Sequence, residues 1–161
     1  MLYSFSGTGT GSVNGAGFTE TPFSIQLLTE NVVYTNGIYF GEAASTALEI
    51  AGFGSGTFTK QTRIFLNTFG AVMGLSNSAT GGDLMNVQTE FFRGYNMKRN
   101  LGPEIVGPAY LTLFRNYSST LGNFSLTKAT DITFTATVVP EPSCGVLAVP
   151  AFLTGLRRRR H

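Results

Sequence analysis

An alternation of apolar and polar residues is the feature that most restricts what this chain can fold into. The clearest run is Ile132 to Val138, in which Ile132, Phe134, Ala136 and Val138 alternate with three threonines. Successive side chains of a strand point to opposite faces, so this run predicts a strand with one apolar face. Similar strand patterns occur at Leu2 to Val13, Phe23 to Leu27, Gly56 to Lys60, Thr62 to Leu66, Ala71 to Leu75, Leu84 to Phe92 and Tyr110 to Phe114.

The composition favours an all-β fold for residues 1–138. The chain has 20 Gly, 14 Phe and 6 Tyr, and only 12% of its residues are charged. Aromatic and β-branched residues favour pleated sheets, whereas Gly, Asn and Ser supply turns. About eight to ten strands separated by short turns predict a single antiparallel β-sandwich of jelly-roll-like arrangement. The sequence shows no alternation of strands with helices, so a parallel α/β fold is disfavoured.

Some segments allow a second interpretation. Glu42 to Ile50 is rich in Ala and is the best helix candidate, although such segments also form loops between strands. The repeats Gly7-x-Gly9-x-Gly11 and Gly52-x-Gly54-x-Gly56 are similar to phosphate loops, which need a following helix and usually a Lys. Because Thr and Phe in strand patterns flank both repeats, we expect strands with bulges or close backbone contacts there.

The positive charge is concentrated at the C-terminal end. The 11 Lys+Arg and 9 Asp+Glu residues give a net charge of +2. Without Glu141 and the arginines at 157–160, 7 basic and 8 acidic residues remain. A nucleic-acid-binding domain spreads Lys and Arg over one face, and residues 1–138 carry no such excess. We therefore expect no nucleic acid as a partner.

The last residues differ from the rest of the chain. A polar motif that contains proline is followed by the apolar run Cys144 to Leu156 and by a basic block. Proline restricts the backbone, so the motif stays extended and accessible to an enzyme. The apolar run can enter a membrane, and the basic block remains on its cytoplasmic side. The motif is Val139, Pro140, Glu141, Pro142 and Ser143, and the basic block is Arg157, Arg158, Arg159 and Arg160.

This order of parts resembles the C-terminal sorting signal of PEP-CTERM proteins, which are exported bacterial proteins handled by an exosortase. The resemblance covers residues 139–160. It implies that an exosortase acts near Pro140-Glu141-Pro142, that the segment contacts the inner membrane, and that residues 1–138 reach the cell surface or an exopolysaccharide matrix. The apolar run has 13 residues and contains Pro150, whereas a stable span needs about 20. This length suits a transient anchor that is later cut.

The start of the chain is similar to β-rich domains that carry this signal. An aromatic-Ser-Gly-Thr-Gly-x-Gly strand, an Asn-Gly pair and a Phe-rich strand correspond here to Phe5 to Ser12, Asn14-Gly15 and Phe18 to Leu27. Export also needs an N-terminal signal with a basic start and an apolar core. Met1 to Phe5 enters a strand pattern directly. We therefore expect a leader upstream of Met1 or a mature form from which it was removed, and a cytoplasmic protein with this tail is the remaining alternative.

Catalytic residues are sparse, and we expect that the chain is not an enzyme. The only histidine is His161, so residues 1–138 have none for a catalytic triad or a metal site. A polysaccharide hydrolase is a remaining alternative, because glycoside hydrolysis needs only two carboxylates across a cleft. The acids of residues 1–138 are scattered singly, which is typical of a solvated surface. They are Glu20, Glu30, Glu42, Glu49, Asp83, Glu90, Glu104 and Asp131.

We expect no cofactor and no metal. Asn77 to Asp83 has oxygen groups suited to calcium but lacks the closely spaced Asp residues of a calcium loop, and its Gly81-Gly82 pair favours an ordinary turn. The only cysteine, Cys144, lies in the apolar run, so no intrachain disulfide can form. Its thiol is either a small apolar filler or an acceptor for a lipid or a thiol-linked intermediate.

Two regions are candidates for ligand recognition. Phe91 to Pro108 is predicted as a long loop, where Arg93, Lys98 and Arg99 are available to an anionic polysaccharide. Aromatic rings stack on sugars in carbohydrate-binding modules, and without Trp this role falls to tyrosines. The main hypothesis is a structural or adhesive surface protein, with a carbohydrate-binding module as the alternative. The candidate tyrosines are Tyr34, Tyr39, Tyr95, Tyr110 and Tyr117.

Overall fold

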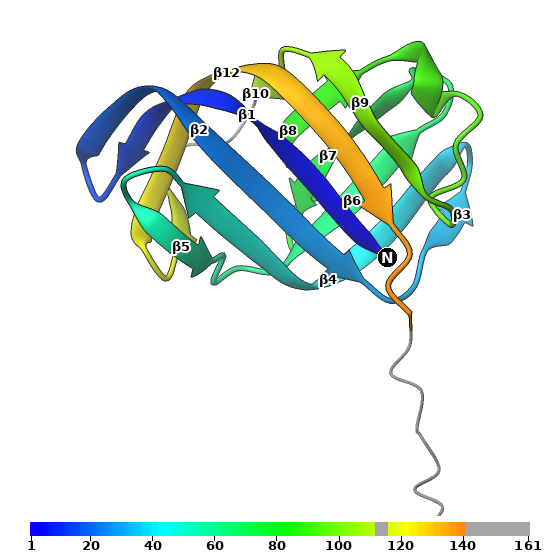
Figure 1. The fold of residues 1–161 in the computed structure, drawn as a ribbon. Helices are drawn as coiled ribbons and strands as arrows, with labels where there is room; N and C mark the ends of the chain where they lie inside the picture. The colour runs from blue at the N-terminus through cyan, green and yellow to red at the C-terminus, as the bar shows by residue number, and fades with distance from the viewer. Residues whose placement is uncertain (112–115, 141–161) are drawn as a thin grey trace, which may run out of the picture.

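A computed structural model describes residues 1–111 and 116–140, and these residues are almost entirely β-structure (Figure 1). They contain twelve strands and one short 3-10 helix. The elements are β1 (Leu2–Val13), β2 (Ala16–Thr29), β3 (Val33–Thr35), β4 (Ile38–Ile50), β5 (Gly54–Thr57), β6 (Thr62–Asn67), β7 (Val72–Asn77), β8 (Asp83–Gln88), η1 (Glu90–Phe92), β9 (Leu101–Gly107), β10 (Tyr110–Leu111), β11 (Tyr117–Ser119) and β12 (Gly122–Thr137).

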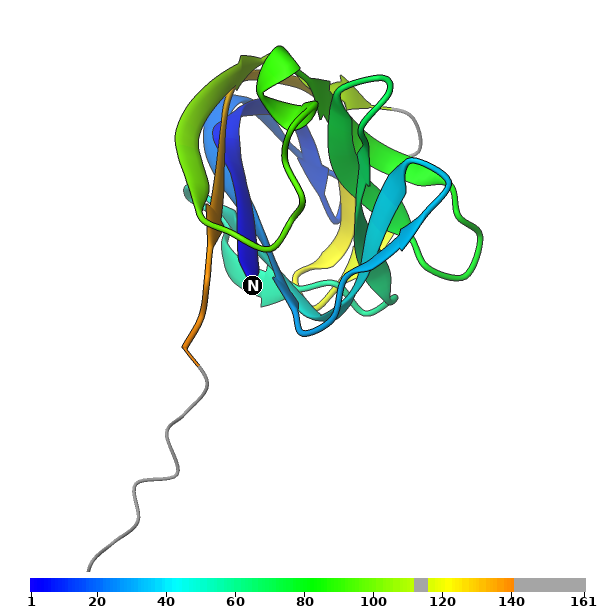
Figure 2. The same cartoon turned by 90° about the vertical axis from the view of Figure 1, so that its right-hand side faces the viewer.

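The strands form one antiparallel sheet that curls around a common core (Figures 1 and 2). Its order is β10-β8-β7-β6-β4-β2-β1-β12-β11, and β3, β5 and β9 pair beside this path. The predicted all-β class and the antiparallel pairing are confirmed.

β4 joins the two halves of the sheet. Its first residues, 38–42, pair with β6, whereas residues 43–50 pair with β2. The register between β2 and β4 shifts between Leu28 and Thr29, at the point where the sheet bends. Gly41 lies at this bend, and a Cβ atom added there would come within 2.4 Å of the Thr29 Cγ2 atom. Glycine therefore permits the close approach of β2 and β4.

The opposite edges of the sheet approach one another and enclose the core. Ala109, just before β10, donates its backbone N–H to the carbonyl oxygen of Ala129 in β12 over 3.1 Å. The Tyr3 hydroxyl donates to the Met97 carbonyl oxygen over 2.6 Å. The first bond joins the segment before β10 to β12, and the second holds the connection between η1 and β9 against β1.

Two aromatic clusters fill the core, and both are centred on β12. Phe134 lies 5.1 Å from Phe5 and 5.3 Å from Phe92 between ring centroids. Phe124 lies 6.4 Å from Phe18 and 6.2 Å from Phe58. Side chains of this size bury large apolar areas, and their tilted contacts add specific geometry. β12 therefore contributes a central side chain at each end of the core.

Several strand predictions are confirmed. β1, β2, β6 and β7 contain or overlap the predicted runs, and Phe23, Ile25 and Leu27 are all buried as expected for one face. The repeat that starts at Gly7 lies in β1, which has bulges against β12 and β2. The repeat that starts at Gly52 lies in the turn before β5 and in β5 itself.

Other predictions were wrong. Glu42 to Ile50 is neither a helix nor a loop but part of β4, because its Ala and Leu residues alternate between core and solvent. Leu84 to Phe92 is not one strand, since β8 ends at Gln88 and η1 follows. The predicted loop Phe91 to Pro108 contains β9, which pairs with β12.

Two predicted strands have different ends. The last strand starts at Gly122 and ends at Thr137, so Val138 lies outside it and is 47% exposed. β10 covers Tyr110–Leu111, and the rest of the predicted run Tyr110 to Phe114 lies outside the described residues.

Thr29 provides a test of the packing at the bend. Among residues 1–111 and 116–140, its Oγ1 atom is the only buried side-chain oxygen or nitrogen without a hydrogen-bond partner. Thr29→Val replaces this hydroxyl with a methyl group and removes its desolvation cost, so we expect the free energy of unfolding to rise by about 1 kcal/mol. Chemical denaturation measures this change.

Thr46→Val is the matched control. The Thr46 hydroxyl is hydrogen-bonded to the Thr62 hydroxyl over 2.6 Å in the core. Removal of the Thr46 hydroxyl leaves the buried Thr62 hydroxyl without this partner. The free energy of unfolding is therefore expected to fall by about 1–3 kcal/mol. Equal destabilisation by both variants would contradict the interpretation of Thr29.

Candidate functional site: the chain exit and the adjacent surfaces

The chain leaves the folded domain directly after β12. The Val138 backbone N–H donates to Asn100 Oδ1 over 2.7 Å, which attaches the end of the strand to the residue before β9. Val138 and Val139 are 47% and 45% exposed. Both views show the chain running away from the domain at this point (Figures 1 and 2). The first residues of the predicted sorting motif are therefore accessible.

A surface depression of about 600 Å³ lies beside this exit. Val139 and Pro140 line it together with Met1 and residues 28–31. The backbones of Met1 and Thr29 are hydrogen-bonded, since the Thr29 N–H donates to the Met1 carbonyl oxygen over 2.9 Å. Residue 1, the end of β2 and the start of the motif are thus neighbours.

The rest of the predicted sorting segment lies outside the described residues. This applies to Glu141, Pro142 and Ser143, to the apolar run Cys144 to Leu156, and to the four arginines at 157–160 with His161. Within residues 1–111 and 116–140, no helix is long and apolar enough to cross a membrane.

Two buried tyrosines hold the connection between η1 and β9. Tyr95 is only 1% exposed, and its hydroxyl donates to the Arg99 carbonyl oxygen over 2.8 Å. Burial raises the pKa of Tyr95 to about 12, although nearby Arg99 lowers it. Burial also raises the pKa of Tyr3, with a smaller contribution from Tyr95. Tyr95 is therefore a core residue rather than a sugar-stacking surface residue.

The three basic residues of the segment Phe91 to Pro108 lie at two different positions in the structure. Arg93 forms an ion pair with Glu90, and its side-chain hydrogen bond lowers the pKa of the Glu90 carboxyl. Lys98 and Arg99 are exposed and lie immediately before Asn100 at the chain exit. The structure therefore separates these basic residues into two positions, and their contact with an anionic polysaccharide stays a prediction.

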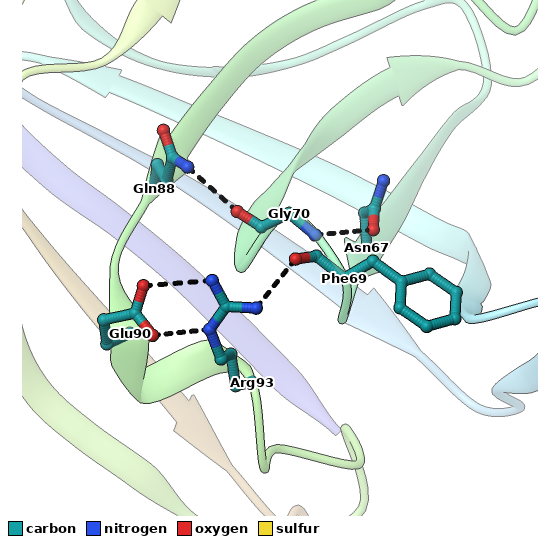
Figure 3. Close-up of polar contacts among 6 residues, drawn as sticks. All are labelled: Asn67, Phe69, Gly70, Gln88, Glu90 and Arg93. Carbon is teal, nitrogen blue, oxygen red and sulfur yellow. Dashed lines mark hydrogen bonds and ion pairs between the residues drawn. The ribbon is translucent and has the colours of Figure 1, made fainter.

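Arg93 belongs to a polar network that holds the turn between β6 and β7 (Figure 3). Its Nη1 atom donates to the Phe69 carbonyl oxygen over 2.8 Å. The Gly70 N–H donates to Asn67 Oδ1 over 3.0 Å, and Gln88 Nε2 donates to the Gly70 carbonyl oxygen over 2.9 Å. These bonds restrict the turn, although the Phe69 side chain is 74% exposed.

Phe69 covers the neighbouring turn between β3 and β4. A Cβ atom on Gly37 would lie 2.0 Å from the Phe69 ring, and Gly37 has a φ of +82°, so glycine is required there for space and for conformation. Tyr34 and Tyr39 flank the same turn, with ring centroids 4.5 Å apart. We call Tyr34, Tyr39 and Phe69 the aromatic rim.

The five candidate tyrosines differ in exposure, and their role in sugar binding stays a prediction. Tyr34 and Tyr110 are exposed, Tyr39 is half-buried, and Tyr95 and Tyr117 are buried. Sequence reasoning missed Phe69 and the exposed Phe91, because a phenylalanine is normally assigned to the core. The position of Phe69 in the short segment Thr68-Phe69-Gly70, between two strand patterns, was the one sequence signal for its exposure.

Two of the scattered acids share a surface depression. Glu30 and Glu42 line a hollow of about 460 Å³ together with Phe40 and Gln61. The Glu42 carboxylate accepts a hydrogen bond from the Ser78 hydroxyl over 2.6 Å. Glycoside hydrolysis needs an acid and a carboxylate on either side of a scissile bond. A shared hollow alone does not supply that arrangement, so no catalytic role is assigned to the pair.

The segment Asn77 to Asp83 forms a turn closed by its own hydrogen bonds. Asn77 Oδ1 accepts from the backbone N–H groups of Ala79 and Thr80 over 2.9 and 3.1 Å. Partial burial raises the pKa of Asp83, with an opposing contribution from Arg63. Within the described ranges, no group of three His, Cys, Asp or Glu residues lies together in a way that would hold a metal ion.

The raised pKa values of Tyr3 and Tyr95 are expected to make the fold less stable at high pH. An unfolded tyrosine titrates near pH 10, whereas folding raises the pKa of Tyr95 to about 12 and that of Tyr3 as well. The unfolded chain therefore binds fewer protons above pH 10, so the free energy of unfolding is expected to fall between pH 10 and about 12.

Tyr95→Phe tests this explanation by denaturation at successive pH values. The variant loses the hydrogen bond to Arg99 at every pH, but one of the two titrations is also removed. We expect a shallower fall of stability above pH 10 than in the wild type. Identical slopes for both proteins would contradict the proposed cause.

Comparison with known proteins adds no relative: no protein-family model, no curated protein and no solved structure matches this chain.

Proposed function

We propose that this chain is an exported bacterial protein that an exosortase sorts through its C-terminal segment. Its domain then has a structural or adhesive role at the cell surface or in an exopolysaccharide matrix. The observation that supports this proposal most is the position of the motif. β12 ends at Thr137, and the motif begins two residues later at an exposed exit. A processing enzyme would therefore meet the start of the motif outside the sheet.

The packing of the domain is compatible with cleavage in this segment. The last buried side chain of β12 is Ala136, and both aromatic clusters lie before it. Removal of the residues after the motif would leave these contacts intact. The resemblance to PEP-CTERM signals rests on the sequence of residues 139–160.

We also propose a jelly-roll-like sandwich as the finer classification of the curled sheet. In this interpretation, β4 passes from the half that contains β1, β2 and β12 to the half that contains β6, β7 and β8. Sandwiches of this kind present broad outer faces, which suit contact with a matrix.

The sorting proposal predicts the fate of a motif variant in an exosortase-bearing bacterium, with a functional export leader placed upstream. A chain with Pro140→Ala, Glu141→Ala and Pro142→Ala is expected to stay membrane-associated, because the motif that the enzyme recognises is absent. The wild-type chain is expected at the surface. Cell fractionation and surface protease accessibility measure this difference.

The matched control removes the same residue types from the domain. Glu49→Ala and Pro108→Ala change exposed positions, and this variant is expected to reach the surface like the wild type. Equal surface delivery of the motif variant and the wild type would contradict exosortase sorting.

Carbohydrate binding is the second candidate function, and the aromatic rim favours it. Phe69 is highly exposed on a turn that Arg93 and Gln88 hold in place, and the Tyr34–Tyr39 pair lies at the neighbouring turn. A preorganised aromatic ring offers a flat apolar face to the C–H groups of a sugar without a large loss of conformational entropy.

Substitution at the rim tests this candidate. If the domain binds a polysaccharide through the rim, Phe69→Ala is expected to weaken retention on the insoluble polysaccharide at least ten-fold, which corresponds to about 1.4 kcal/mol. Ile105→Ala is the control, because it shortens a side chain that is 79% exposed on β9. Equal retention of both variants on every glycan that binds the wild type would exclude the rim.

A further inference from the structure

We propose that the exit end of the domain rests on an anionic phospholipid surface through Lys98 and Arg99. The exit end comprises the chain exit at 138–140, the Lys98–Asn100 connection and the end of β2. This inference rests on the proposed membrane insertion of the C-terminal segment, and it adds which surface of the domain faces the lipid and which groups contact it.

The two cations lie beside the chain exit. Asn100 accepts a hydrogen bond from the backbone of Val138, so Lys98 and Arg99 come immediately before the residue that holds the exit. Figures 1 and 2 show the connection into β9 and residue 1 at the end of the domain from which the chain departs. A membrane that receives the C-terminal segment would therefore approach this end.

Hydrogen bonds hold the backbone of Lys98 and Arg99 in place, while their side chains face solvent. The Lys98 N–H donates to Asn96 Oδ1 over 3.1 Å, and Tyr95 and Tyr3 hold Arg99 and Met97 by their carbonyl oxygens. Both cationic side chains are exposed, and Arg99 Nη2 also donates to the Gly94 carbonyl oxygen over 3.3 Å. Within residues 1–111 and 116–140, the only ion pair joins Arg93 to Glu90, so neither cation is neutralised by a carboxylate of the described domain.

The chain between the domain and the apolar run is short. Cys144, the start of the apolar run, lies four positions after Pro140, and an extended chain covers about 14 Å over that length. The polar interface on each side of a bilayer is about 5–8 Å thick. The exit end is thereby confined near the headgroups, within reach of the electrostatic attraction that acts over about 8–10 Å.

The opposite end of the domain lies beyond this range. Lys128 pairs with Thr10 in the sheet, and Thr10 lies eight residues along β1 from Leu2 at the exit end. A strand of that length covers about 27 Å, so a charge at Lys128 is screened from the membrane. Lys128 therefore serves as the internal reference for the cations of the exit end.

Two carboxylates oppose this interaction: that of Glu141, which follows Pro140 in the sequence, and that of Glu30. Glu30 is exposed and lines the same depression as Val139 and Pro140. Two cations balance these two carboxylates, so a preference for phosphatidylglycerol over a neutral lipid depends on direct contact of Lys98 and Arg99 with the headgroups.

The experiment uses the full chain reconstituted in vesicles of phosphatidylcholine with phosphatidylglycerol. In a Cys144→Ser background, a fluorophore is attached at Asn31→Cys, at the exit end, or at Thr19→Cys on β2 near the opposite end. A quencher on the lipid headgroup is expected to quench the label at position 31 strongly and the label at position 19 weakly. Removal of phosphatidylglycerol or addition of salt is expected to reduce quenching at position 31.

Charge variants identify the residues. Lys98→Gln and Arg99→Gln are each expected to shift the equilibrium away from the docked state by about five-fold, whereas Lys128→Gln leaves quenching at position 31 unchanged. Equal quenching of both labels, or no effect of Lys98→Gln and Arg99→Gln, would overturn the inference. If those two variants instead lose only binding to an anionic polysaccharide such as alginate, the lipid assignment is likewise overturned.

Vesicle flotation separates this inference from the proposed function. A chain that floats with the vesicles but shows no preferential quenching at position 31 overturns membrane docking and leaves C-terminal anchoring intact. A chain that fails to float in the first place overturns the anchoring and the docking together.

Discussion

The packing of Phe134 and Phe124 on β12 is the interaction on which the rest of the structure depends. Phe134 contacts rings from β1 and η1, and Phe124 contacts rings from β2 and from the segment after β5. β12 also pairs with β1 along its length and with β9 and β11 on its other side. One strand therefore connects both aromatic clusters, and it pairs with other strands along both of its edges.

The end of β12 also determines the surroundings of the C-terminal segment. Because the sheet is packed as far as Ala136, the exit is held against Asn100 and the end of β2 rather than on a free linker. The proposed sorting motif thus begins within a few residues of a rigid domain. This short separation connects the fold to the proposed function, since it limits how far the domain can move from a membrane that holds the apolar run.

Sequence reasoning succeeded where one local pattern decided the outcome. The alternation around Ile132 to Ala136 and the period of Phe23 to Leu27 are each explained by one buried face. It failed at β4, where Ala residues gave a weak signal and pairing with β2 and β6 determined the strand. β9 was missed because Gly and Pro interrupt its pattern. Phe69 was missed because its exposure follows from hydrogen bonds between distant residues.

We propose that processing next to the motif separates a folded domain, complete at β12, from the C-terminal segment. The most direct test is the intact mass and the thermal unfolding of the mature protein from an exosortase-bearing bacterium. We expect a mass that lacks the apolar run and the arginines at 157–160, with a Tm equal to that of the full chain. A surface protein that retains the four terminal arginines would contradict the account, as would a processed chain with a markedly lower Tm.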